Sequence, residues 1–246
     1  MAPTPLYRRS GLKHSFNGMS FEQILQDSAA IAQVYPVSQH VRTGIYPAYV
    51  KRPLDIVLAL LLLPILAPVI ALLWFLVRLD GGSGFFGHSR VGRDGTSFKC
   101  WKMRSMNIDA EVKLVSHLLA CPAAAAEWAR DHKLANDPRI TKIGAFLRKS
   151  SLDELPQIWN VLKGEMSFVG PRPVVTDELS RYGVSRWAYL HARPGITGLW
   201  QVSGRNEVSY ESRVALDVLY SKEIRFDRDL WILAKTAGAV VHGTGK

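Results

Sequence analysis

Residues 51–78 read KRPLDIVLALLLLPILAPVIALLWFLVR, and this stretch decides what kind of protein the chain is. Its central 22 residues, 56–77, carry no charged side chain, whereas charged residues flank them on both sides. A straight helix of that length rises about 33 Å, enough to cross a hydrocarbon core of about 30 Å. The alternative is a buried helix of a soluble protein, but a run this long favours insertion into a membrane.

Two prolines interrupt this apolar run, and they predict a bend. Pro64 and Pro68 are four residues apart and share a face, and each removes a backbone donor and crowds the preceding turn. Six Lys or Arg residues precede the run through Arg52, and six more follow by Arg104. Because basic flanks stay cytoplasmic, both ends belong on the same side. We therefore expect a re-entrant helix over residues 48–79 rather than a spanning one.

The bulk composition points to anionic partners. The 246 residues carry a net charge of +10, which suits phosphates, nucleic acid or an anionic membrane face. No nucleic-acid recognition motif is present, and the membrane segment argues for a membrane protein instead. Cys100 and Cys121 form neither a disulfide framework nor a spaced metal motif.

The rest of the chain predicts a mixed α/β fold, mainly helical, with a small β-hairpin. We expect residues 1–47 to form a loosely ordered extension with a short helix over 20–32, and residues 80–246 to form a cytoplasmic domain, to which the motifs described below assign catalysis. The Asp94-Gly95 turn predicts a hairpin of strands 85–91 and 96–103. Further expected elements are helices at 110–119, 123–134, 143–149, 153–162, 177–190 and 209–222, a strand at 166–169 and an extended segment at 196–202. Residues 230–241 are apolar almost all round, which suits either a core segment or an amphipathic helix in the membrane interface.

Asp153 and Glu154 lie in the densest run of informative residues, and they allow two readings. Ser151-x-x-Glu154 before an apolar stretch matches a capping box, and acids in a first helical turn are favoured by the helix dipole. The same helix start also favours a bound phosphate, so a structural and a catalytic role can coexist.

The chemistry available to this pair is attack on a phosphorus atom. An ordinary aspartate is ionised at neutral pH and needs no general base to act as a nucleophile. Its repulsion from a diphosphate is relieved by Mg²⁺ and by arginines, whose planar fork binds two phosphate oxygens. Arg148 and Arg172 are the candidate cations, and Glu154 can supply an oxygen ligand to magnesium.

Several motifs, in order along residues 48–242, resemble the bacterial sugar transferase family, the monotopic phosphoglycosyl transferases. The matching pieces are Lys51-Arg52-Pro53-Leu54-Asp55, Lys99-x-x-Lys102-Met103-Arg104-Ser105-Met106, Ser151-Leu152-Asp153-Glu154-Leu155-Pro156-Gln157, Phe168-Val169-Gly170-Pro171-Arg172-Pro173, and Arg193-Pro194-Gly195-Ile196-Thr197-Gly198-Leu199-Trp200-Gln201-Val202-Ser203-Gly204-Arg205-Asn206. Two positions depart from the family pattern: Ala67 stands where Ser usually precedes Pro68, and His88 stands where Gln is usual.

The resemblance implies a priming enzyme of exopolysaccharide synthesis at the cytoplasmic face of the bacterial inner membrane. Such members move hexose 1-phosphate from UDP-galactose or UDP-glucose to undecaprenyl phosphate and release UMP. The family pattern makes Asp153 the nucleophile that carries the phosphosugar and Glu154 the Mg²⁺ ligand. It assigns Arg148 and Arg172 to phosphate binding and places Lys102, Arg205 and Asp217 near the site. The choice of hexose and a homo-oligomeric state stay open.

Two rival functions remain. Asp227-Arg228-Asp229 suggests a metal-dependent glycosyltransferase that releases UDP, although acids at a helix start ordinarily cap it. A catalytically silent membrane scaffold for polysaccharide assembly is the second rival, and the intact Asp-Glu pair with both arginines argues against it.

Overall fold

The computed structural model describes residues 44–131, 133–203 and 209–241, so the extension over residues 1–43, with the helix expected at 20–32, lies outside the described residues. The described chain is mainly helical with two small sheets, as the sequence predicts. A short π-helical turn, η1 (Tyr46–Val50), leads directly into the long apolar helix α2 (Lys51–Arg78).

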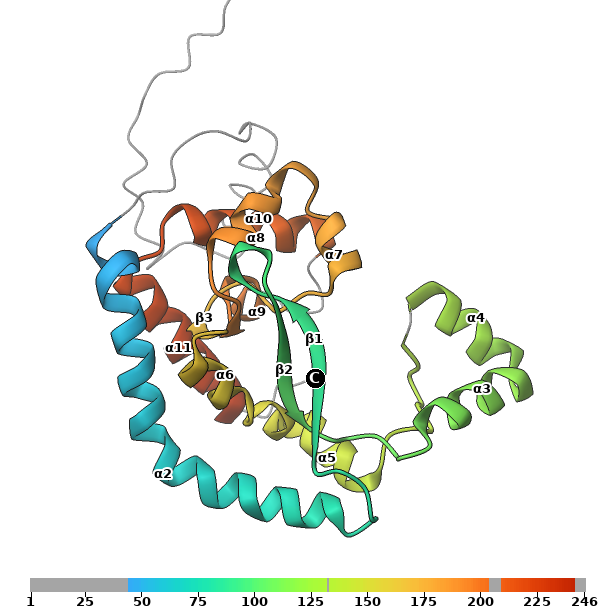
Figure 1. The fold of residues 1–246 in the computed structure, drawn as a ribbon. Coiled ribbons are helices and arrows are strands. Elements are labelled where there is room, and N and C mark those ends of the chain that lie inside the picture. The colour runs from blue at the N-terminus through green and yellow to red at the C-terminus, as the bar shows by residue number, and fades with distance from the viewer. Residues whose placement is uncertain (1–43, 132, 204–208, 242–246) are drawn as a thin grey trace, which may run out of the picture.

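Helix α2 wraps around the rest of the domain (Figure 1). It continues through Pro64 and Pro68, and its two halves leave the bend in different directions. Together, η1 and α2 are long and apolar enough to cross a membrane. The inner face packs on the core through leucines such as Leu58 and Leu62. The outer face exposes Val57, Leu60, Leu61, Ile65, Leu72 and Phe75. An apolar surface this continuous marks contact with lipid or protein.

The start of α2 is bound to the catalytic domain by polar side chains. Lys51 pairs with the buried Asp229, and Arg52 donates to the carbonyl oxygens of Val161 and Leu162. Asp55 is buried and accepts from the backbone N–H of Phe168 at 3.1 Å. The charged residues that open the helix therefore dock it on the domain, which composition alone does not indicate.

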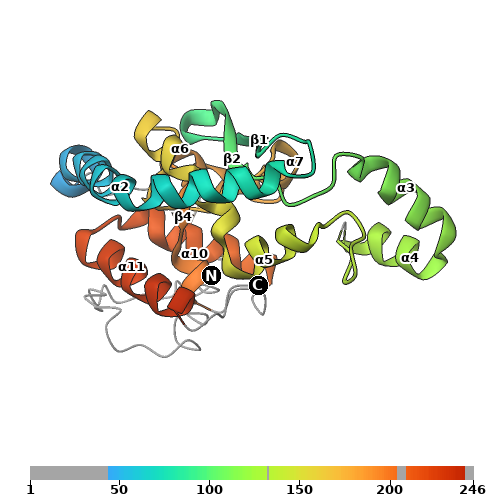
Figure 2. The same cartoon turned by 90° about the horizontal axis from the view of Figure 1, so that it is seen from below.

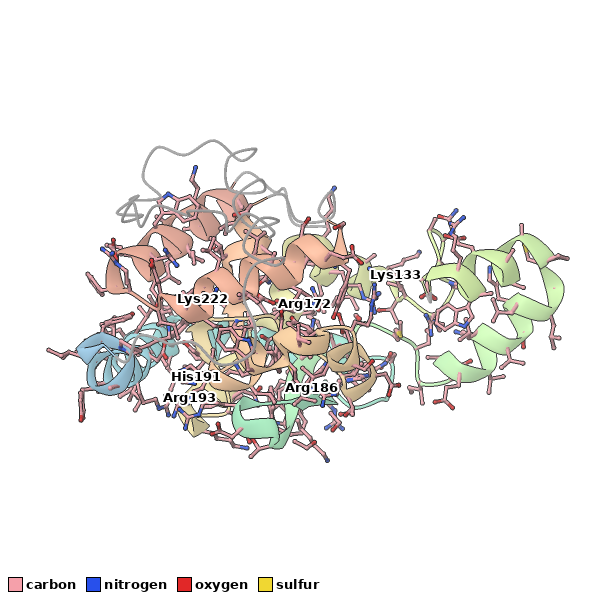
Figure 3. All side chains as sticks on the ribbon, turned by 90° about the horizontal axis from the view of Figure 1, so that it is seen from above. Lys133, Arg172, Arg186, His191, Arg193 and Lys222 are labelled. Carbon is pink, nitrogen blue, oxygen red and sulfur yellow. The ribbon has the colours of Figure 1, made fainter. Side chains whose placement is uncertain are left out.

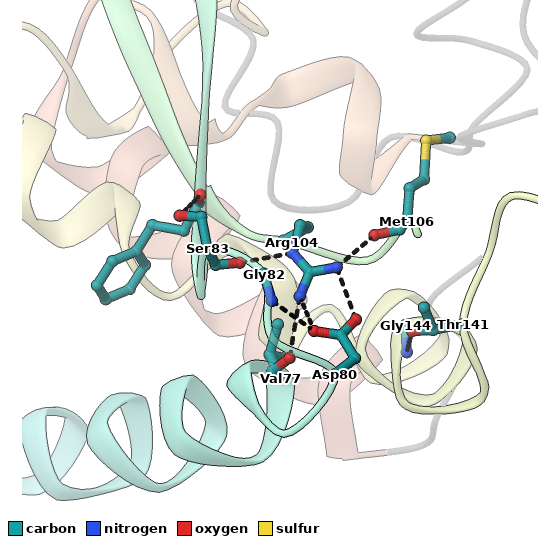
Figure 4. Close-up of polar contacts among 9 residues, drawn as sticks. Val77, Asp80, Gly82, Ser83, Arg104, Met106, Thr141 and Gly144 are labelled. Carbon is teal, nitrogen blue, oxygen red and sulfur yellow. Dashed lines mark hydrogen bonds and ion pairs between the residues drawn. The ribbon is translucent and has the colours of Figure 1, made fainter. Parts of the chain in front are cut away.

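The end of α2 is bound to the same domain through Arg104, as Figure 4 shows. The Arg104 guanidinium donates to the carbonyl oxygens of Val77 and Met106, at 3.0 and 2.8 Å, and to both carboxylate oxygens of Asp80. It also donates to the carbonyl oxygen of Ser83. One side chain thus joins the last turn of α2 to the strand that precedes the site.

The predicted hairpin is confirmed. Strand β1 (Phe85–Val91) pairs antiparallel with β2 (Ser97–Met103), which starts one residue later than expected. A 3-10 turn, η2 (Arg93–Gly95), joins them, and Asp94 and Gly95 both have positive φ angles. Asp-Gly suits this turn because aspartate tolerates and glycine favours the left-handed region.

The helices that follow largely match the predicted ranges. Confirmed elements are α3 (Ala110–Ala120), α4 (Pro122–Asp131), α5 (Lys142–Ser150), α10 (Tyr210–Lys222) and α11 (Phe226–Val241). Helices α3 and α4 stand away from the rest of the domain (Figure 2).

Two expectations were wrong. The single helix at 177–190 is instead α7 (Thr176–Ser180), a 3-10 turn η4 (Gly183–Ser185) and α8 (Arg186–His191), because Gly183 takes a positive φ between them. The extended segment at 196–202 is a short strand, β4 (Gly195–Thr197), followed by one helical turn, α9 (Leu199–Val202).

Strand β3 (Ser167–Val169) pairs in parallel with β4. The main core gathers around this pair: Met166, Val169 and Leu199 are almost fully buried and pack with the inner face of α2. Helix α2 and the elements around the β3–β4 pair therefore share one hydrophobic core.

Candidate active site

Asp153 and Glu154 lie in a 3-10 turn, η3 (Leu152–Glu154), between α5 and α6 (Gln157–Lys163). Ser151 takes the left-handed conformation, with φ 57°, and ends α5. Leu155 and Pro156 both have right-handed helical backbone angles, but Pro156 has no N–H to continue the helical hydrogen-bond pattern. The α-helix expected from residue 153 therefore begins only at Gln157.

The capping box predicted at Ser151 and Glu154 is not formed. The Ser151 side chain accepts no capping hydrogen bond, and the contact between these residues runs from the Glu154 backbone N–H to the Ser151 carbonyl oxygen. The Glu154 carboxylate instead faces a lysine from the hairpin. Since the side chains are not used as caps, both carboxylates are available to a ligand.

Lys102 brings the two carboxylates together. Its Nζ lies 2.6 Å from Oε1 of Glu154 and 3.4 Å from Oδ2 of Asp153. Burial lowers the pKa of Lys102, but the two carboxylates outweigh it and raise that pKa overall. Burial raises the pKa of Asp153, and the Lys102 charge opposes this shift. Burial thus disfavours the ionised form of the Asp153 carboxylate, and the Lys102 ammonium group favours that form.

The position of Lys102 is fixed by Asn160, which is fully buried on α6. The Asn160 side chain accepts from the Trp101 backbone N–H at 3.0 Å and donates to the Lys99 carbonyl oxygen at 2.7 Å. It ties β2 to the helix that directly follows the Asp-Glu turn. Strand β2, which carries Lys102, is therefore joined to helix α6, which follows the turn that carries Asp153.

Arg148 is positioned by Ser105, at the end of the hairpin. Arg148 Nε donates to Ser105 Oγ at 2.8 Å. Helix α5 lies close to this residue, because a Cβ at Gly144 would come within 2.0 Å of the Ser105 carbonyl oxygen. The same carbonyl accepts from the Thr141 backbone N–H at 3.1 Å. Only glycine permits this approach, which sets how far Arg148 reaches toward the Asp-Glu turn.

Arg172 is exposed on the segment that leaves β3, in the middle of the domain (Figure 3). Gly170 N–H donates to Thr197 O at 2.9 Å, and Gly195 N–H donates to Pro171 O at 2.8 Å. A Cβ at Gly170 would come within 2.2 Å of the Arg193 carbonyl oxygen. The two glycine-proline motifs thus form one tightly packed unit that carries Arg172.

One open cavity of about 1880 Å³ collects these side chains. It exceeds the range of about 300 to 1,000 Å³ that is typical of small-molecule pockets, so it has room for more than one substrate. Its described lining carries eight Lys or Arg residues against four Asp or Glu residues. Among them are Asp153, Glu154, Lys102, Arg148 and Arg172, so the structure brings the predicted catalytic pair and three of the predicted cations together in one cavity.

Sequence reasoning assigned no role to several other groups in the same cavity. Arg90 and His88 project from β1, and Ser105 and Lys149 also line it. Burial and the nearby Arg172 charge lower the pKa of Arg90, which indicates two guanidinium groups crowded together. The alternation of β1 places residues 86, 88 and 90 on one face, and this was the signal that could have identified them.

Two predicted positions do not join the cavity lining. Asp217 is buried on α10, where it accepts from the Tyr182 hydroxyl at 2.7 Å, and burial raises its pKa to about 7. It is a core residue and not part of the described lining. Arg205 lies outside the described residues.

The Asp227-Arg228-Asp229 triplet has a structural role. Asp229 accepts from Lys51 and from the hydroxyls of Tyr46 and Tyr220. Asp227 pairs with Arg225 at the surface, and Arg228 donates to the Leu219 carbonyl oxygen. The three side chains point to separate partners, which does not fit one metal centre.

Glu154 is the residue that fits Mg²⁺ best. The described residues contain no cluster of three or more His, Cys, Asp or Glu side chains. Magnesium at phosphate sites usually takes one or two protein carboxylates and completes its shell with water and substrate phosphates. The Glu154 side chain is 30% exposed in the cavity and meets that requirement beside the buried Asp153.

A helix apolar enough to cross a membrane, joined to a cationic cavity with a paired Asp and Glu, fits a membrane-associated enzyme. The sequence profile of the bacterial sugar transferase family matches residues 46–243, and the chain belongs to that family.

Its relatives include the UDP-galactose-lipid carrier transferase of Erwinia amylovora, 53% identical over 197 residues. The undecaprenyl-phosphate galactose phosphotransferase of Salmonella typhimurium is 52% identical over 197 residues. In both, the match covers 80% of this chain and 41% of the relative, so the chain spans about two fifths of their length. The exopolysaccharide production protein ExoY of Rhizobium meliloti is 49% identical over 196 residues, which cover 79% of this chain and 87% of ExoY.

Proposed function

We propose that this protein transfers a hexose 1-phosphate from UDP-galactose or UDP-glucose to undecaprenyl phosphate, releases UMP, and thereby primes exopolysaccharide synthesis. The names of the relatives from Erwinia, Salmonella and Rhizobium support this assignment. The observation that carries it is the Lys102 ammonium group between the carboxylates of Asp153 and Glu154, inside a cavity rich in cations.

In the first half-reaction, a carboxylate oxygen of Asp153 attacks the phosphorus that bears the sugar. A bond forms between that oxygen and phosphorus, the bond to the bridging oxygen of the diphosphate breaks, and UMP leaves with its electron pair. In the second, a phosphate oxygen of undecaprenyl phosphate attacks the same phosphorus and displaces Asp153. The product is a diphosphate-linked sugar, and the carboxylate is regenerated.

The cations of the cavity support both steps. Lys102 opposes the burial that raises the pKa of Asp153, and Arg148, Arg172 and Arg90 line the space in which the diphosphate must lie. Guanidinium groups bind phosphate oxygens in pairs and stabilise the charge that develops on the leaving UMP. Arg205 is part of the proposal as a further substrate-binding residue.

We include Mg²⁺ as a cofactor, which Glu154 would hold. Bound there, the ion would supply positive charge that relieves the repulsion between the diphosphate and the Asp153 carboxylate.

We infer that α2 is re-entrant and that the catalytic domain lies at the cytoplasmic face of the inner membrane. Lys51 and Arg52 bind one end of α2 to the domain, and Arg104 binds the other end to the same domain. A single domain with one core lies on one side of a bilayer, which supports a helix that enters and leaves by the same face. UDP-sugars are cytosolic, and the phosphate of the lipid acceptor stays at the interface.

The test is intact-mass analysis of the purified protein with individual UDP-sugars and no lipid acceptor. We expect UMP release and a hexose-phosphate adduct on Asp153, and the sugar that forms it identifies the donor. Asp153→Asn should give no adduct and lower turnover at least about 10³-fold while the protein stays folded. Formation of the lipid product without any adduct on saturating donor would contradict the covalent mechanism. Release of UDP would support the rival glycosyltransferase.

A further inference from the structure

Two arginine side chains approach each other in the reaction cavity. Arg90 projects from β1, Arg172 follows β3, and both line the cavity. Burial lowers the pKa of Arg90 and the charge of Arg172 lowers it further, so the two guanidinium groups repel each other. The carboxylate of Glu178 favours charged Arg90 from a distance, but neither arginine forms a hydrogen bond or an ion pair with another described residue. Like charges held together in this way favour an anion between them.

A backbone contact joins the segments that carry these two arginines. The Val91 N–H, directly after Arg90, donates to the carbonyl oxygen of Val174 at 2.9 Å. Val174 lies two residues after Arg172 in the chain. The contact is at the end of β1, near the hairpin turn and beside helix α8 (Figure 1). It therefore sets how far apart the two arginines stand.

Tyr189 on α8 completes this connection. Its hydroxyl donates to the Val91 carbonyl oxygen at 2.6 Å and accepts from the Val174 N–H at 3.1 Å. The side chain is fully buried in a second hydrophobic cluster that contains both valines, and its ring packs edge-on against Tyr182, with 5.5 Å between the ring centroids. Without the hydroxyl, two buried backbone groups lose this partner. Tyr189 is not part of the described cavity lining, so its effect on a substrate must act through the two arginines.

The register of the hairpin shows which part of the cavity the arginine pair occupies. Phe86 stands opposite Lys102, and Arg90 follows Phe86 on the same face by four residues, or about 13 Å along the strand. Lys102 contacts Asp153, whereas Arg90 lies toward the hairpin turn. The charge of Arg172 acts on both Lys102 and Arg90, so Arg172 faces the space between them. The arginine pair therefore lies beyond Lys102 as seen from the proposed nucleophile.

We propose that Arg90 and Arg172 together bind the phosphate that leaves with the nucleotide, and that Tyr189 is the residue that positions them. This proposal rests on the function proposed above. The phosphorus that Asp153 attacks must lie within about 3.5 Å of a carboxylate oxygen, and the second phosphate of the donor lies one bridging oxygen farther away. That direction leads toward the arginine pair. Two planar guanidinium groups bind the oxygens of one phosphate in pairs and offset its charge.

The experiment measures equilibrium binding of UMP and of uridine to the purified full-length protein in detergent. UMP carries the phosphate in question, and uridine lacks it. We expect Arg90→Ala to raise the Kd for UMP about tenfold and to leave the Kd for uridine within twofold. Arg90→Ala combined with Arg172→Ala should weaken UMP binding less than the product of the two single effects, because either substitution already removes the repulsion that the phosphate relieves. Arg93→Ala, on the same hairpin but outside the described lining, should change neither Kd.

Tyr189→Phe tests the positioning role. We expect the Kd for UMP and the KM for the UDP-sugar to rise by the same factor, about three- to tenfold, with a smaller change in kcat. Binding of uridine should stay within twofold of wild type, whereas a merely structural defect would not separate UMP from uridine. Tyr210→Phe is the matched control, because it also deletes one hydroxyl from this region, the donor to the Glu178 carbonyl oxygen at 2.9 Å. It should leave UMP binding unchanged.

An unchanged Kd for UMP in Arg90→Ala would overturn the paired site, and so would an equal loss of UMP and uridine, which indicates general damage. Single effects that multiply in the double variant would assign the two arginines to separate sites. Normal UMP binding by Tyr189→Phe would overturn the positioning role. A wild type that binds UMP but releases none from UDP-sugars contradicts the proposed function and not the paired site, whereas a wild type that does not bind UMP contradicts the site itself.

Discussion

Lys102 Nζ lies 3.4 Å from Asp153 Oδ2, although 51 positions separate the two residues in the chain. The contact joins the hairpin to the turn between α5 and α6, and it sets the charge of the carboxylate proposed as nucleophile. Burial alone would keep this aspartate protonated to a higher pH, and Lys102 opposes that effect.

Replacing Lys102 should therefore change the pH dependence of the reaction. Lys102→Met removes the charge that lowers the pKa of Asp153, so Asp153 stays protonated to a higher pH. We expect the acidic limb of the kcat/KM profile to move to higher pH, with a loss of about 100-fold near neutrality. Lys99→Met, on the same strand but exposed, is the control. An unshifted acidic limb in the Lys102 variant would show that Asp153 does not depend on this contact.

Arg172 should affect donor binding more than chemistry or stability. Arg172→Ala should raise the KM for the UDP-sugar about 10- to 100-fold, because a hydrogen-bonded charge pair with phosphate is lost. Arg172→Lys should be intermediate, since a lysine keeps the charge but loses the planar fork. Arg186→Ala is the matched control, because Arg186 is exposed on α8 and does not line the cavity. Unchanged steady-state kinetics for Arg172→Ala would remove this residue from the site.

Glu154→Gln should alter the metal dependence of the enzyme. The amide is a weaker oxygen donor than the carboxylate, so we expect the Mg²⁺ concentration for half-maximal rate to rise at least about tenfold. Titration of UMP release with MgCl₂ measures this directly. Glu111→Gln, at the rim of the same cavity, should leave the titration unchanged. A normal Mg²⁺ requirement in the Glu154 variant would contradict the ligand role.

Arg104 should matter for stability because it binds the end of α2 to the domain. Arg104→Ala leaves Asp80 and the carbonyl oxygens of Val77 and Met106 without this donor, and we expect a loss of about 2 to 4 kcal/mol in the free energy of unfolding. Faster hydrogen exchange should be confined to the neighbourhood of residues 77–84 and 104–106. Arg93→Ala breaks only the exposed pair with Asp94 and should cost less than about 0.5 kcal/mol. A stable Arg104 variant with unchanged exchange would show that the core alone holds this end of α2.

Asp217 should make the stability of the domain depend on pH. Its pKa is raised by burial to about 7 in the folded protein, against about 3.9 in an unfolded chain. The folded state therefore binds the Asp217 proton more tightly than the unfolded chain does. The stabilisation of the fold by this proton is fully present below about pH 4 and is lost as the pH rises to about 7. The advantage of wild type over Asp217→Asn should accordingly shrink across this window, by up to about 4 kcal/mol. Chemical unfolding at several pH values measures it, and a constant difference would contradict the shifted pKa.

Local patterns were sufficient for much of the fold. The apolar length of residues 56–77, the Asp94-Gly95 turn and the apolar periodicity of α5 depend on neighbouring residues, and the long helix, the hairpin and α5 were found where expected. Errors occurred where local signals were ambiguous. Ser151-x-x-Glu154 matches a capping box, but the contact with Lys102 takes the Glu154 carboxylate and Ser151 adopts a left-handed conformation instead.

The sequence by itself determined that the chain has a long apolar helix, a short hairpin and an Asp-Glu pair with basic residues nearby, because hydrophobic length, turn chemistry and residue type are local properties. Only the tertiary structure decided that Lys102 faces Asp153, that Arg90 and His88 line the cavity, and that Asp229 holds the start of α2 rather than a metal. Such contacts join residues far apart in the chain, and they depend on how helices and strands pack to bury a common core. No spacing in the sequence encodes that packing.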